Sequence, residues 1–292
     1  MDSPPYQLVR LANGTFSVRS VAEKETFHPV IGPVAEARAL YVNQLRLRAR
    51  LQEQAGEFVI WDVGLGAGGN VLTVFAATAD LARPLRVVSF DHTLAPLQFA
   101  LNHAAALAYV EPYRAPVREL LQSGRADFRN GAQPVSWEFQ LGDFPARLRG
   151  PAPLPAPHAI LFDAFSPAKN PEMWNAPFFS NLFQRLSPEH PCAMPTYSRS
   201  TMLRVTLLLA GFFVGIGHAT GEKEETTLAA NTLALLPQPL PRAWLQRARN
   251  SKSAEPMWEP HYRQAPLTPA TWEKLRHHPQ FQQSTPPCGG GL

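Results

Sequence analysis

Cysteine is scarce in this chain of 292 residues, which contains only Cys192 and Cys288. Two cysteines build neither a disulfide framework nor a zinc knuckle, so we expect a protein of the reducing cytoplasm that holds no metal. Long hydrophobic runs are also missing. The longest apolar stretch, Val205–Gly217, is shorter than the roughly 20 residues of a membrane-spanning helix and is interrupted by glycines. Because Met1–Pro5 does not begin a signal peptide, we expect no membrane partner.

Charge of one sign does not dominate the chain. It has 27 Lys and Arg against 23 Asp and Glu, a formal net charge of +4, and 45% hydrophobic residues, which suffice for a globular core. Residues 237–292 alone carry a net charge of +4. Such a segment fits a polyanionic partner, and it fits a solvated tail equally well.

The most informative segment is a glycine-rich turn after an apolar run. The run Phe58–Val63 is followed by Gly64, Gly66 and Gly68, and Val71 begins a further apolar segment. Glycines let the backbone turn sharply and approach a ligand, and the N-terminus of a following helix presents N–H groups to a negatively charged ligand group. This pattern predicts a nucleotide cofactor at the turn.

Two kinds of cofactor fit this glycine-rich pattern. Gly64, Gly66 and Gly69 satisfy the dinucleotide fingerprint, with Asp91 about 20 residues further on. The alternative is the G-x-G-x-G of S-adenosylmethionine sites, where an acid such as Asp62 precedes the first glycine. We favour the second, because a carboxylate repels a pyrophosphate but attracts an ammonium and a sulfonium. The predicted cofactor-binding residues here are Asp62, Gly64, Gly66, Gly68 and Asn70; a tight turn without a ligand is the structural alternative.

Strands and helices alternate after residue 57, which predicts a doubly wound, Rossmann-like α/β fold with ligands at the carboxyl ends of its strands. The expected strands are 58–63, 86–91, 136–141, 158–162, 192–197 and 212–218. The expected helices are 71–81, 96–108, 176–186 and 201–210.

Three regions follow from this organisation: residues 1–57, 58–236 and 237–292. The first contains a β-hairpin over Tyr6–Val21 that turns at Asn13-Gly14, and then an amphipathic helix from Pro33 to Leu51. The last is a proline-rich arm with one or two short helices, followed by a floppy end, Ser284–Leu292. Its aromatic residues are expected to dock on the core: Trp244, Trp258, Tyr262 and Trp272.

Acidic residues follow three successive strands. Asp91 is placed to accept hydrogen bonds from both ribose hydroxyls of a nucleoside, and Asp143 to accept one from an adenine amino group flanked by Phe144. Asp163 follows the next strand. A helix cap, a plain turn and a loop cap are the structural alternatives for these three acids.

The segment Asp163–Trp174 is the most distinctive in the chain. It resembles the D-G-F-x-P-x-K-N-P-x-M-W motif of the tRNA 5-methylaminomethyl-2-thiouridine methyltransferase family, MnmC. The family's downstream motifs are matched by Thr196-Tyr197-Ser198 and Ala210-Gly211-Phe212. The resemblance spans about Phe27–Asn231, and nothing after residue 236 resembles the flavin-dependent oxidase domain of bifunctional members. It therefore implies a stand-alone methyltransferase module.

The resemblance implies methylation of the aminomethyl group of a modified wobble uridine in tRNA, with S-adenosyl-L-methionine as cofactor and a separate enzyme supplying that uridine. Asp163 is then the catalytic candidate, orienting the amine. Glu36, together with His28, is a candidate for closing over the methionine part of the cofactor. The substrate candidates are Phe165, Trp174 and Tyr197 as a slot for the uracil ring, and Pro167 and Lys169 in the loop. Core packing of the aromatics and a solvated lysine are the alternatives.

Three positions depart from the family pattern. Ala164 replaces a usual Gly, Asp62 replaces a frequent Glu, and Glu224 stands where the family has Arg, which weakens a phosphate contact. Other functions therefore stay open: methylation of a small-molecule or protein amine, an NAD-type oxidoreductase, and a module that binds cofactor or RNA without catalysis.

Overall fold

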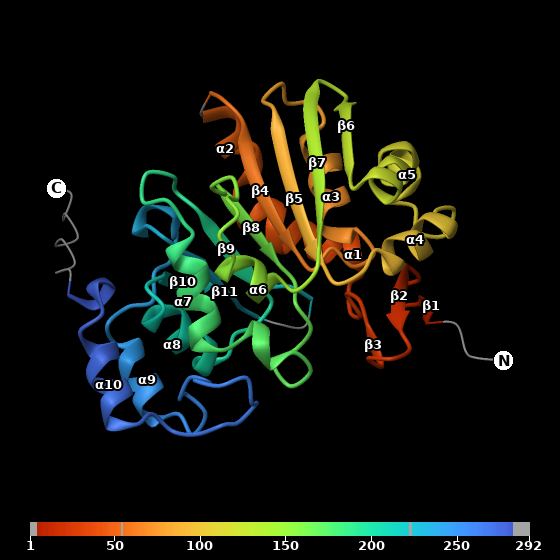
Figure 1. The fold of residues 1–292 in the computed structure, drawn as a ribbon. Coiled ribbons are helices and arrows are strands. Elements are labelled where there is room, and N and C mark those ends of the chain that lie inside the picture. The colour runs from red at the N-terminus through yellow and green to blue at the C-terminus, as the bar shows by residue number, and fades with distance from the viewer. Residues whose placement is uncertain (1–4, 54, 222–223, 283–292) are drawn as a thin grey trace, which may run out of the picture.

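The computed structural model of the protein describes residues 5–53, 55–221 and 224–282; Cys288 and the predicted end Ser284–Leu292 lie outside them. A sheet of eight strands in the order β10-β11-β9-β8-β4-β5-β7-β6 forms the centre of the molecule (Figure 1). Its strands are β4 (Phe58–Val63), β5 (Leu85–Asp91), β6 (Arg125–Asn130), β7 (Gln133–Leu141), β8 (Ala159–Phe162), β9 (Ala193–Thr196), β10 (Phe213–Gly217) and β11 (Thr226–Ala230).

The middle of the sheet is parallel. Neighbouring strands among β7, β5, β4, β8 and β9 run in the same direction, whereas β6, β11 and β10 each pair antiparallel with a neighbour. The carboxyl ends of the parallel strands therefore meet at one edge, as the sequence predicted. Two strands, β6 and β11, were not predicted. β6 is an edge strand that pairs with the longer β7, whereas β11, whose residues show no alternation, lies between β9 and β10.

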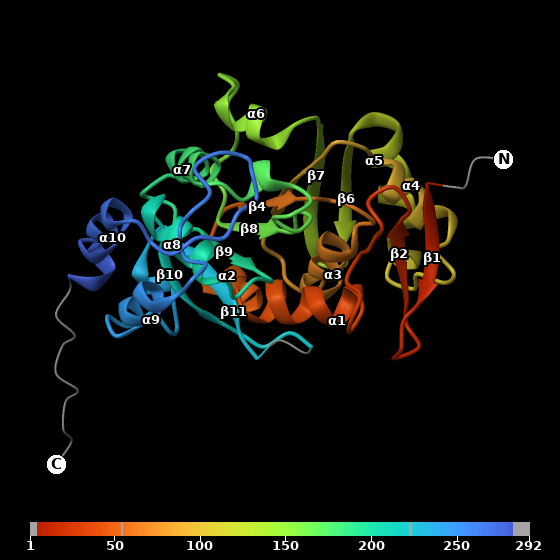
Figure 2. The same cartoon turned by 90° about the horizontal axis from the view of Figure 1, so that it is seen from below.

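Helices cover both faces of the sheet (Figures 1 and 2). One face is packed by α1 (Pro33–Ala37), α2 (Leu47–Glu53), α3 (Gly69–Thr78), α4 (Ala95–Asn102) and α5 (Arg114–Ser123). The other is packed by α6 (Phe144–Arg149), α7 (Ala176–Gln184), α8 (Thr201–Leu209), α9 (Trp244–Asn250) and α10 (Pro269–Arg276). Short helical turns lie at Glu111–Tyr113, Pro171–Met173, Leu233–Leu235 and Pro279–Phe281.

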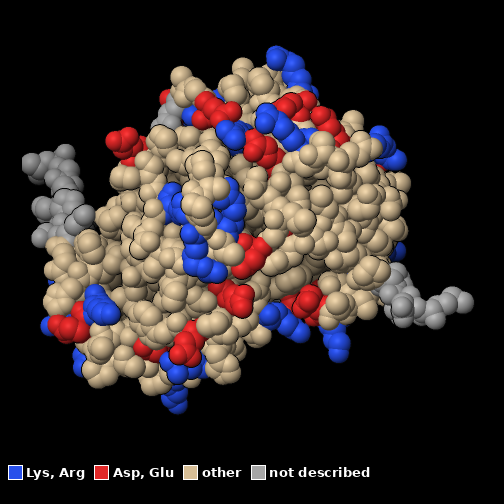
Figure 3. Space-filling view, in the orientation of Figure 1, with Lys and Arg blue, Asp and Glu red and all other residues tan. Residues whose placement is uncertain are grey.

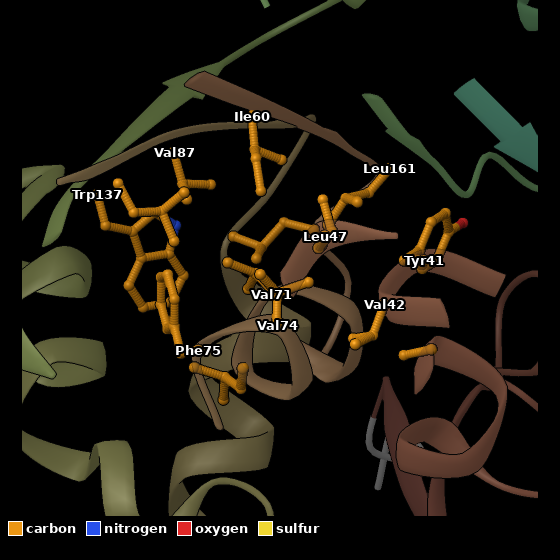
Figure 4. Packing of buried hydrophobic residues seen from close by; sticks show 14 of the residues in the cluster. Tyr41, Val42, Leu47, Ile60, Val71, Val74, Phe75, Val87, Trp137 and Leu161 are labelled. Atoms are coloured by element: carbon orange, nitrogen blue, oxygen red, sulfur yellow. The ribbon is translucent and has the colours of Figure 1, made fainter. Parts of the chain in front are cut away.

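Alternate residues of β4 supply both cores. Phe58 and Ile60 belong to the cluster beneath α3, while Val59, Trp61 and Val63 belong to the cluster on the other face. Figure 4 shows the first cluster, in which side chains from the sheet meet those of α3 and the preceding helical segment. Each large apolar side chain buried in this way stabilises the fold by roughly 1.5–3 kcal/mol, and together they fix the strand ends that carry the site.

The N-terminal hairpin is confirmed. β1 (Tyr6–Arg10) pairs with β2 (Phe16–Ser20) across the Asn13-Gly14 turn, and a short third strand, β3 (Glu25–Thr26), joins them. The single helix predicted from Pro33 to Leu51 is wrong, because a π-helical segment, Arg38–Asn43, follows α1 and the chain then breaks at Arg46 (φ 51°) before α2.

The segment after β11 docks on the sheet. Its helices α9 and α10 bury Trp244 and Leu275 in the second core cluster, whereas Trp258 and Tyr262 remain 39% and 38% exposed. The amide of Gln280 both accepts from the backbone N–H of Val214 and donates to its carbonyl, each at 2.8 Å. This contact covers the free edge of β10, which otherwise offers unpaired backbone groups to other chains. Among the described helices, none is long and apolar enough to cross a membrane.

Candidate active site

The glycine-rich turn joins β4 to α3 at the carboxyl edge of the sheet. Gly64, Gly66 and Gly68 have φ values of 90°, 51° and 77°, a region that favours glycine. A Cβ atom on Gly64 would lie 2.6 Å from the carbonyl oxygen of Asp163, so the ends of β4 and β8 approach too closely for any side chain. Gly68 precedes the first residue of α3, and no side chain caps this helix. The backbone N–H groups at its start are therefore available to a ligand.

Asp62 lies beneath this turn and is fully buried. Its Oδ2 atom accepts a hydrogen bond of 2.7 Å from the Ser89 hydroxyl, which in turn accepts one from the Trp137 indole, and its Oδ1 atom has no partner among the described residues. The pKa of Asp62 is raised to about 7, mainly by burial; the nearby carboxylates of Asp163 and Asp91 add to the rise, and the Ser89 hydrogen bond opposes it. A bound cation would relieve this accumulation of negative charge.

Asp91 ends β5 beside the turn. Its Oδ2 atom accepts from the backbone N–H of Gly66 at 2.9 Å, and its Oδ1 atom accepts from that of His92 at 2.7 Å. Burial raises the pKa of Asp91 above its usual value, although the two backbone N–H groups act against it. The carboxylate thus fastens the glycine-rich turn to the end of β5. It does not cap a helix, since α4 begins after Leu94.

Asp143 and Phe144 follow β7 at the same edge. Asp143 is partly exposed and precedes α6 without a side-chain cap hydrogen bond. The Phe144 ring is buried, with its centroid 4.7 Å from that of Phe90 and 6.3 Å from that of Trp61. Phe144 therefore packs in the second core cluster, and its predicted contact with adenine stays a prediction.

Asp163 contacts residues from two other segments of the site. Its Oδ2 atom accepts a hydrogen bond of 2.8 Å from the Asn70 amide in the first turn of α3, and it lies 3.5 Å from Nε2 of His28. The other imidazole nitrogen of His28 lies 3.7 Å from a carboxylate oxygen of Glu36 in α1. The structure thus brings together Asn70, Asp163 and Glu36, three predicted site residues that are far apart in the sequence.

The predicted aromatic residues divide into two groups. Phe165 is partly exposed, and its ring centroid lies 5.9 Å from that of Phe27. Tyr197 is also partly exposed and donates its hydroxyl to the carbonyl of Ala164 at 3.1 Å. Trp174 is 2% exposed, and its indole donates to the carbonyl of Phe165. In this conformation Trp174 supports the loop from below, while Phe165 and Tyr197 border the site.

The remaining predicted loop residues lie nearer the solvent. Pro167 is partly exposed and Lys169 is exposed. The stretch from residue 166 to residue 170 is held by backbone hydrogen bonds from Lys169 and Asn170 to the carbonyl of Ser166. The substrate roles of Pro167 and Lys169 stay predictions.

Sequence reasoning missed two supports of the site. A Cβ atom on Gly66 would lie 3.5 Å from the ring of Phe27, so Phe27 packs directly on the turn. Tyr41 donates its hydroxyl to the carbonyl of Phe162, the residue before Asp163, at 3.0 Å. Both belong to the stretch that precedes the glycine motif. The only signal there was an aromatic residue amid helical spacing, which ordinary core packing explains as well.

Comparisons with known proteins agree with this arrangement. A family model described as S-adenosyl-L-methionine-dependent methyltransferase matches residues 123–232. A protein from Aeromonas hydrophila named tRNA 5-methylaminomethyl-2-thiouridine biosynthesis bifunctional protein MnmC is 30% identical over 236 residues, covering 73% of this chain and 34% of its own length. The MnmC of Methylibium petroleiphilum is 29% identical over 239 residues, covering 79% of this chain and 35% of its own length.

Over these stretches the chain is similar to a family of S-adenosyl-L-methionine-dependent methyltransferases and to part of MnmC. It spans about a third of the length of these curated relatives. A crystal structure titled MNMC2 from Aquifex aeolicus superimposes with a TM-score of 0.69 at 23% identity, covering 94% of this chain and 85% of that one, which supports the fold.

The residues at the turn fit S-adenosyl-L-methionine. The start of α3 has no side-chain cap, and the Oδ1 atom of the buried Asp62 has no partner among the described residues. Backbone N–H groups at a helix start suit the carboxylate of the cofactor's methionine part, and an aspartate carboxylate suits its positive charges. Within the described ranges, no group of three or more His, Cys, Asp and Glu residues is arranged to hold a metal ion.

Proposed function

We propose that the protein transfers a methyl group to the nitrogen of an aminomethyl group on a modified wobble uridine of tRNA. The observation that carries the proposal is the position of Asp163. Its carboxylate is fixed by Asn70 at the start of α3, beside the glycine-rich turn and next to the partly exposed rings of Phe165 and Tyr197. An acceptor nitrogen held there lies beside the predicted cofactor site. The names of the MnmC relatives supply the class of acceptor.

Asp163 would bind and orient the amine. S-adenosyl-L-methionine, when bound, supplies an electrophilic methyl carbon. An alkylamine has an intrinsic pKa near that of lysine, so it enters the site as a cation and must lose a proton before its lone pair can attack. A carboxylate attracts the cationic amine and then accepts a hydrogen bond from the neutral form, which directs the lone pair away from Asp163.

Phe165 and Tyr197 would hold the base. Unpaired bases in RNA sites are commonly stacked on aromatic rings, at roughly 1–3 kcal/mol per base. Phe165 is supported from behind by Phe27, and Tyr197 by its hydrogen bond to Ala164. Both rings are therefore preorganised, whereas Trp174 supports them from within the loop.

The acceptor must come from another reaction. An enzyme that leaves a primary aminomethyl group on the wobble uridine would supply the substrate of this one. The rest of the tRNA would be held by Lys and Arg side chains, which are interspersed with Asp and Glu on the face shown in Figure 3.

The test is methyl transfer to purified tRNA. The protein is incubated with S-adenosyl-L-methionine and tRNA bearing the aminomethyl uridine, and the digested nucleosides are separated by mass spectrometry. The expected result is a gain of one methyl group on that nucleoside alone, and none on a transcript of the same sequence without the modification.

A second outcome of the test is transfer to free amines. The replacement of a family Arg by Glu224 weakens a phosphate contact and favours a small-molecule or protein amine as acceptor. Methylation of such an amine with no change in tRNA would contradict the proposal and support this alternative.

A further inference from the structure

His28 lies between two carboxylates that come from different elements. Its Nδ1 atom lies 3.7 Å from Glu36 in α1, and its Nε2 atom lies 3.5 Å from Asp163 after β8. The side chains are 9%, 17% and 21% exposed for His28, Glu36 and Asp163 respectively. An imidazole with a carboxylate at each nitrogen is suited to carry a proton on both, and hence a positive charge.

The backbone holds this ring at the cofactor turn. His28 has a φ value of 49°, in the left-handed region that a non-glycine residue rarely adopts. A Cβ atom on Gly69, the first residue of α3, would lie 3.5 Å from Nε2 of His28. The imidazole therefore lies over the start of α3, where the cofactor's charges are expected.

The charge of His28 is balanced by its neighbours. Burial alone would lower the pKa of His28, but the carboxylates of Asp163 and Glu36 together raise it above its usual value. The same two carboxylates contribute to raising the pKa values of Tyr41 and Tyr197, which remain neutral hydroxyls, and Asn70 is uncharged. A second cation brought to this place repels the imidazolium and competes with it for Glu36.

We propose that His28 is a positioning residue whose positive charge balances the negative charges of Glu36 and Asp163 when no cationic ligand is bound. His28 then releases its proton when the sulfonium cofactor binds. A second step, during methyl transfer, rests on the proposed function. There, the neutral imidazole receives the proton of the substrate ammonium through the Asp163 carboxylate, 3.5 Å away.

The proton balance closes over one turnover. Cofactor binding releases one proton from His28 to solvent, and the substrate ammonium then passes one proton by way of Asp163 to Nε2. The neutral amine forms the new N–C bond while the S–C bond breaks with its electron pair remaining on sulfur. Product release leaves His28 protonated, as at the start, and the net reaction liberates one proton.

The direct test is the titration of His28 by NMR. The protein is labelled with ¹⁵N-histidine, and the His28 signal is assigned by its absence in His28→Gln. We expect the His28 pKa to lie above the usual value of about 6.5 in the ligand-free protein and to fall when S-adenosyl-L-methionine is added. The uncharged thioether of S-adenosylhomocysteine should produce a smaller fall. An unshifted pKa in the ligand-free protein, or one that neither ligand changes, would overturn the inference.

Two matched variants separate charge from packing. Glu36→Gln keeps the shape of its side chain and should lower the His28 pKa without loss of the fold. His28→Lys introduces a cation that does not discharge readily, so it should weaken binding of S-adenosyl-L-methionine at least tenfold more than His28→Gln does. Equal affinities of the two His28 variants would contradict the charge exchange.

Kinetic measurements test the role of His28 during methyl transfer. His28→Gln should lower kcat by roughly 100-fold at neutral pH, a typical effect of losing a proton acceptor, and recover activity as the pH rises. The NMR titration needs no methyl acceptor. If the His28 pKa does not behave as expected, only the role of His28 is overturned. If it does, but the protein does not methylate tRNA, the proposed function is overturned.

Discussion

Asp163 contacts Asn70 in α3 and His28 in the loop before α1. In Asp163→Asn the side chain keeps its size but loses the charge that attracts and orients an ammonium. We expect kcat for methyl transfer to fall at least about 100-fold, with the affinity for S-adenosyl-L-methionine nearly unchanged in calorimetry. Equal losses of both would instead assign Asp163 to the cofactor.

Asp62 makes the stability of the protein depend on pH. Its pKa is about 7 in the folded protein against a usual value of 3.8, so the folded state holds a proton that the unfolded state has lost. The stability of the wild type therefore falls as the pH rises from about 4 to 7. Asp62→Asn, which cannot ionise, should gain on the order of 2 kcal/mol relative to wild type between pH 5 and pH 8.

Denaturant unfolding of both proteins at the two pH values measures this difference. Ser89→Ala serves as a control, because it removes the hydrogen bond to Asp62 but leaves the ionisable group in place. A constant difference between Asp62→Asn and wild type across this range would show that Asp62 is ionised throughout.

At the scale of single elements, the turn between β4 and α3 depends on Gly64. Alanine there combines a positive φ with a Cβ atom 2.6 Å from the Asp163 carbonyl oxygen, so the ends of β4 and β8 must separate. We expect Gly64→Ala to lower the free energy of unfolding by at least about 2 kcal/mol and to abolish cofactor binding.

Gly124→Ala is the matched control. Gly124 also has a positive φ, at the end of α5, but a Cβ atom there meets nothing within 4 Å. It should cost only the backbone strain and leave cofactor binding intact. If both variants bind the cofactor equally well, the close approach of β4 and β8 is not required for the site.

The sequence predicted those elements in which local pattern and tertiary packing agree. β4 is buried throughout and apolar apart from Asp62, and it ends at a glycine turn, so its position was readable. The segment Pro33–Leu51 has helical spacing, yet the chain breaks at Arg46, because tertiary contacts of Leu45 and Leu47 overrode the local periodicity. The strand β11 followed a charged stretch and carries no alternation, so only its place between β9 and β10 reveals it.

The same reasoning explains which parts of the site were predictable. Asp91 and Asp163 follow strands, and parallel topology brings strand ends together. The contact of His28 with Asp163 was not predictable, since it depends on the path of a loop 135 positions away in the sequence. The burial of Trp174 was not predictable either, because the motif that contains it indicates a loop but not which of its rings faces inward.

At the scale of the whole molecule, the basic C-terminal segment is attached to the sheet through α9, α10 and Gln280 and is thus held in a fixed position. Its exposed residues Arg242 and Arg263 are suited to contact phosphates. We expect the double charge reversal Arg242→Glu with Arg263→Glu to weaken tRNA binding roughly tenfold and to reduce its dependence on salt concentration.

Filter binding at several salt concentrations measures both effects. Arg118→Glu with Arg129→Glu, in α5 and β6 at the opposite edge of the sheet, changes the net charge equally outside the segment and should have little effect. Equal losses from the two surfaces would show that tRNA responds to net charge rather than to the C-terminal segment.

The measurement that tests the account most directly is calorimetric titration of the purified protein with S-adenosyl-L-methionine and, separately, with NAD⁺. The acids gathered beneath the glycine-rich turn predict binding of the cationic donor at a single site and no binding of the dinucleotide. Binding of NAD⁺ in place of S-adenosyl-L-methionine, or of neither, would contradict the account.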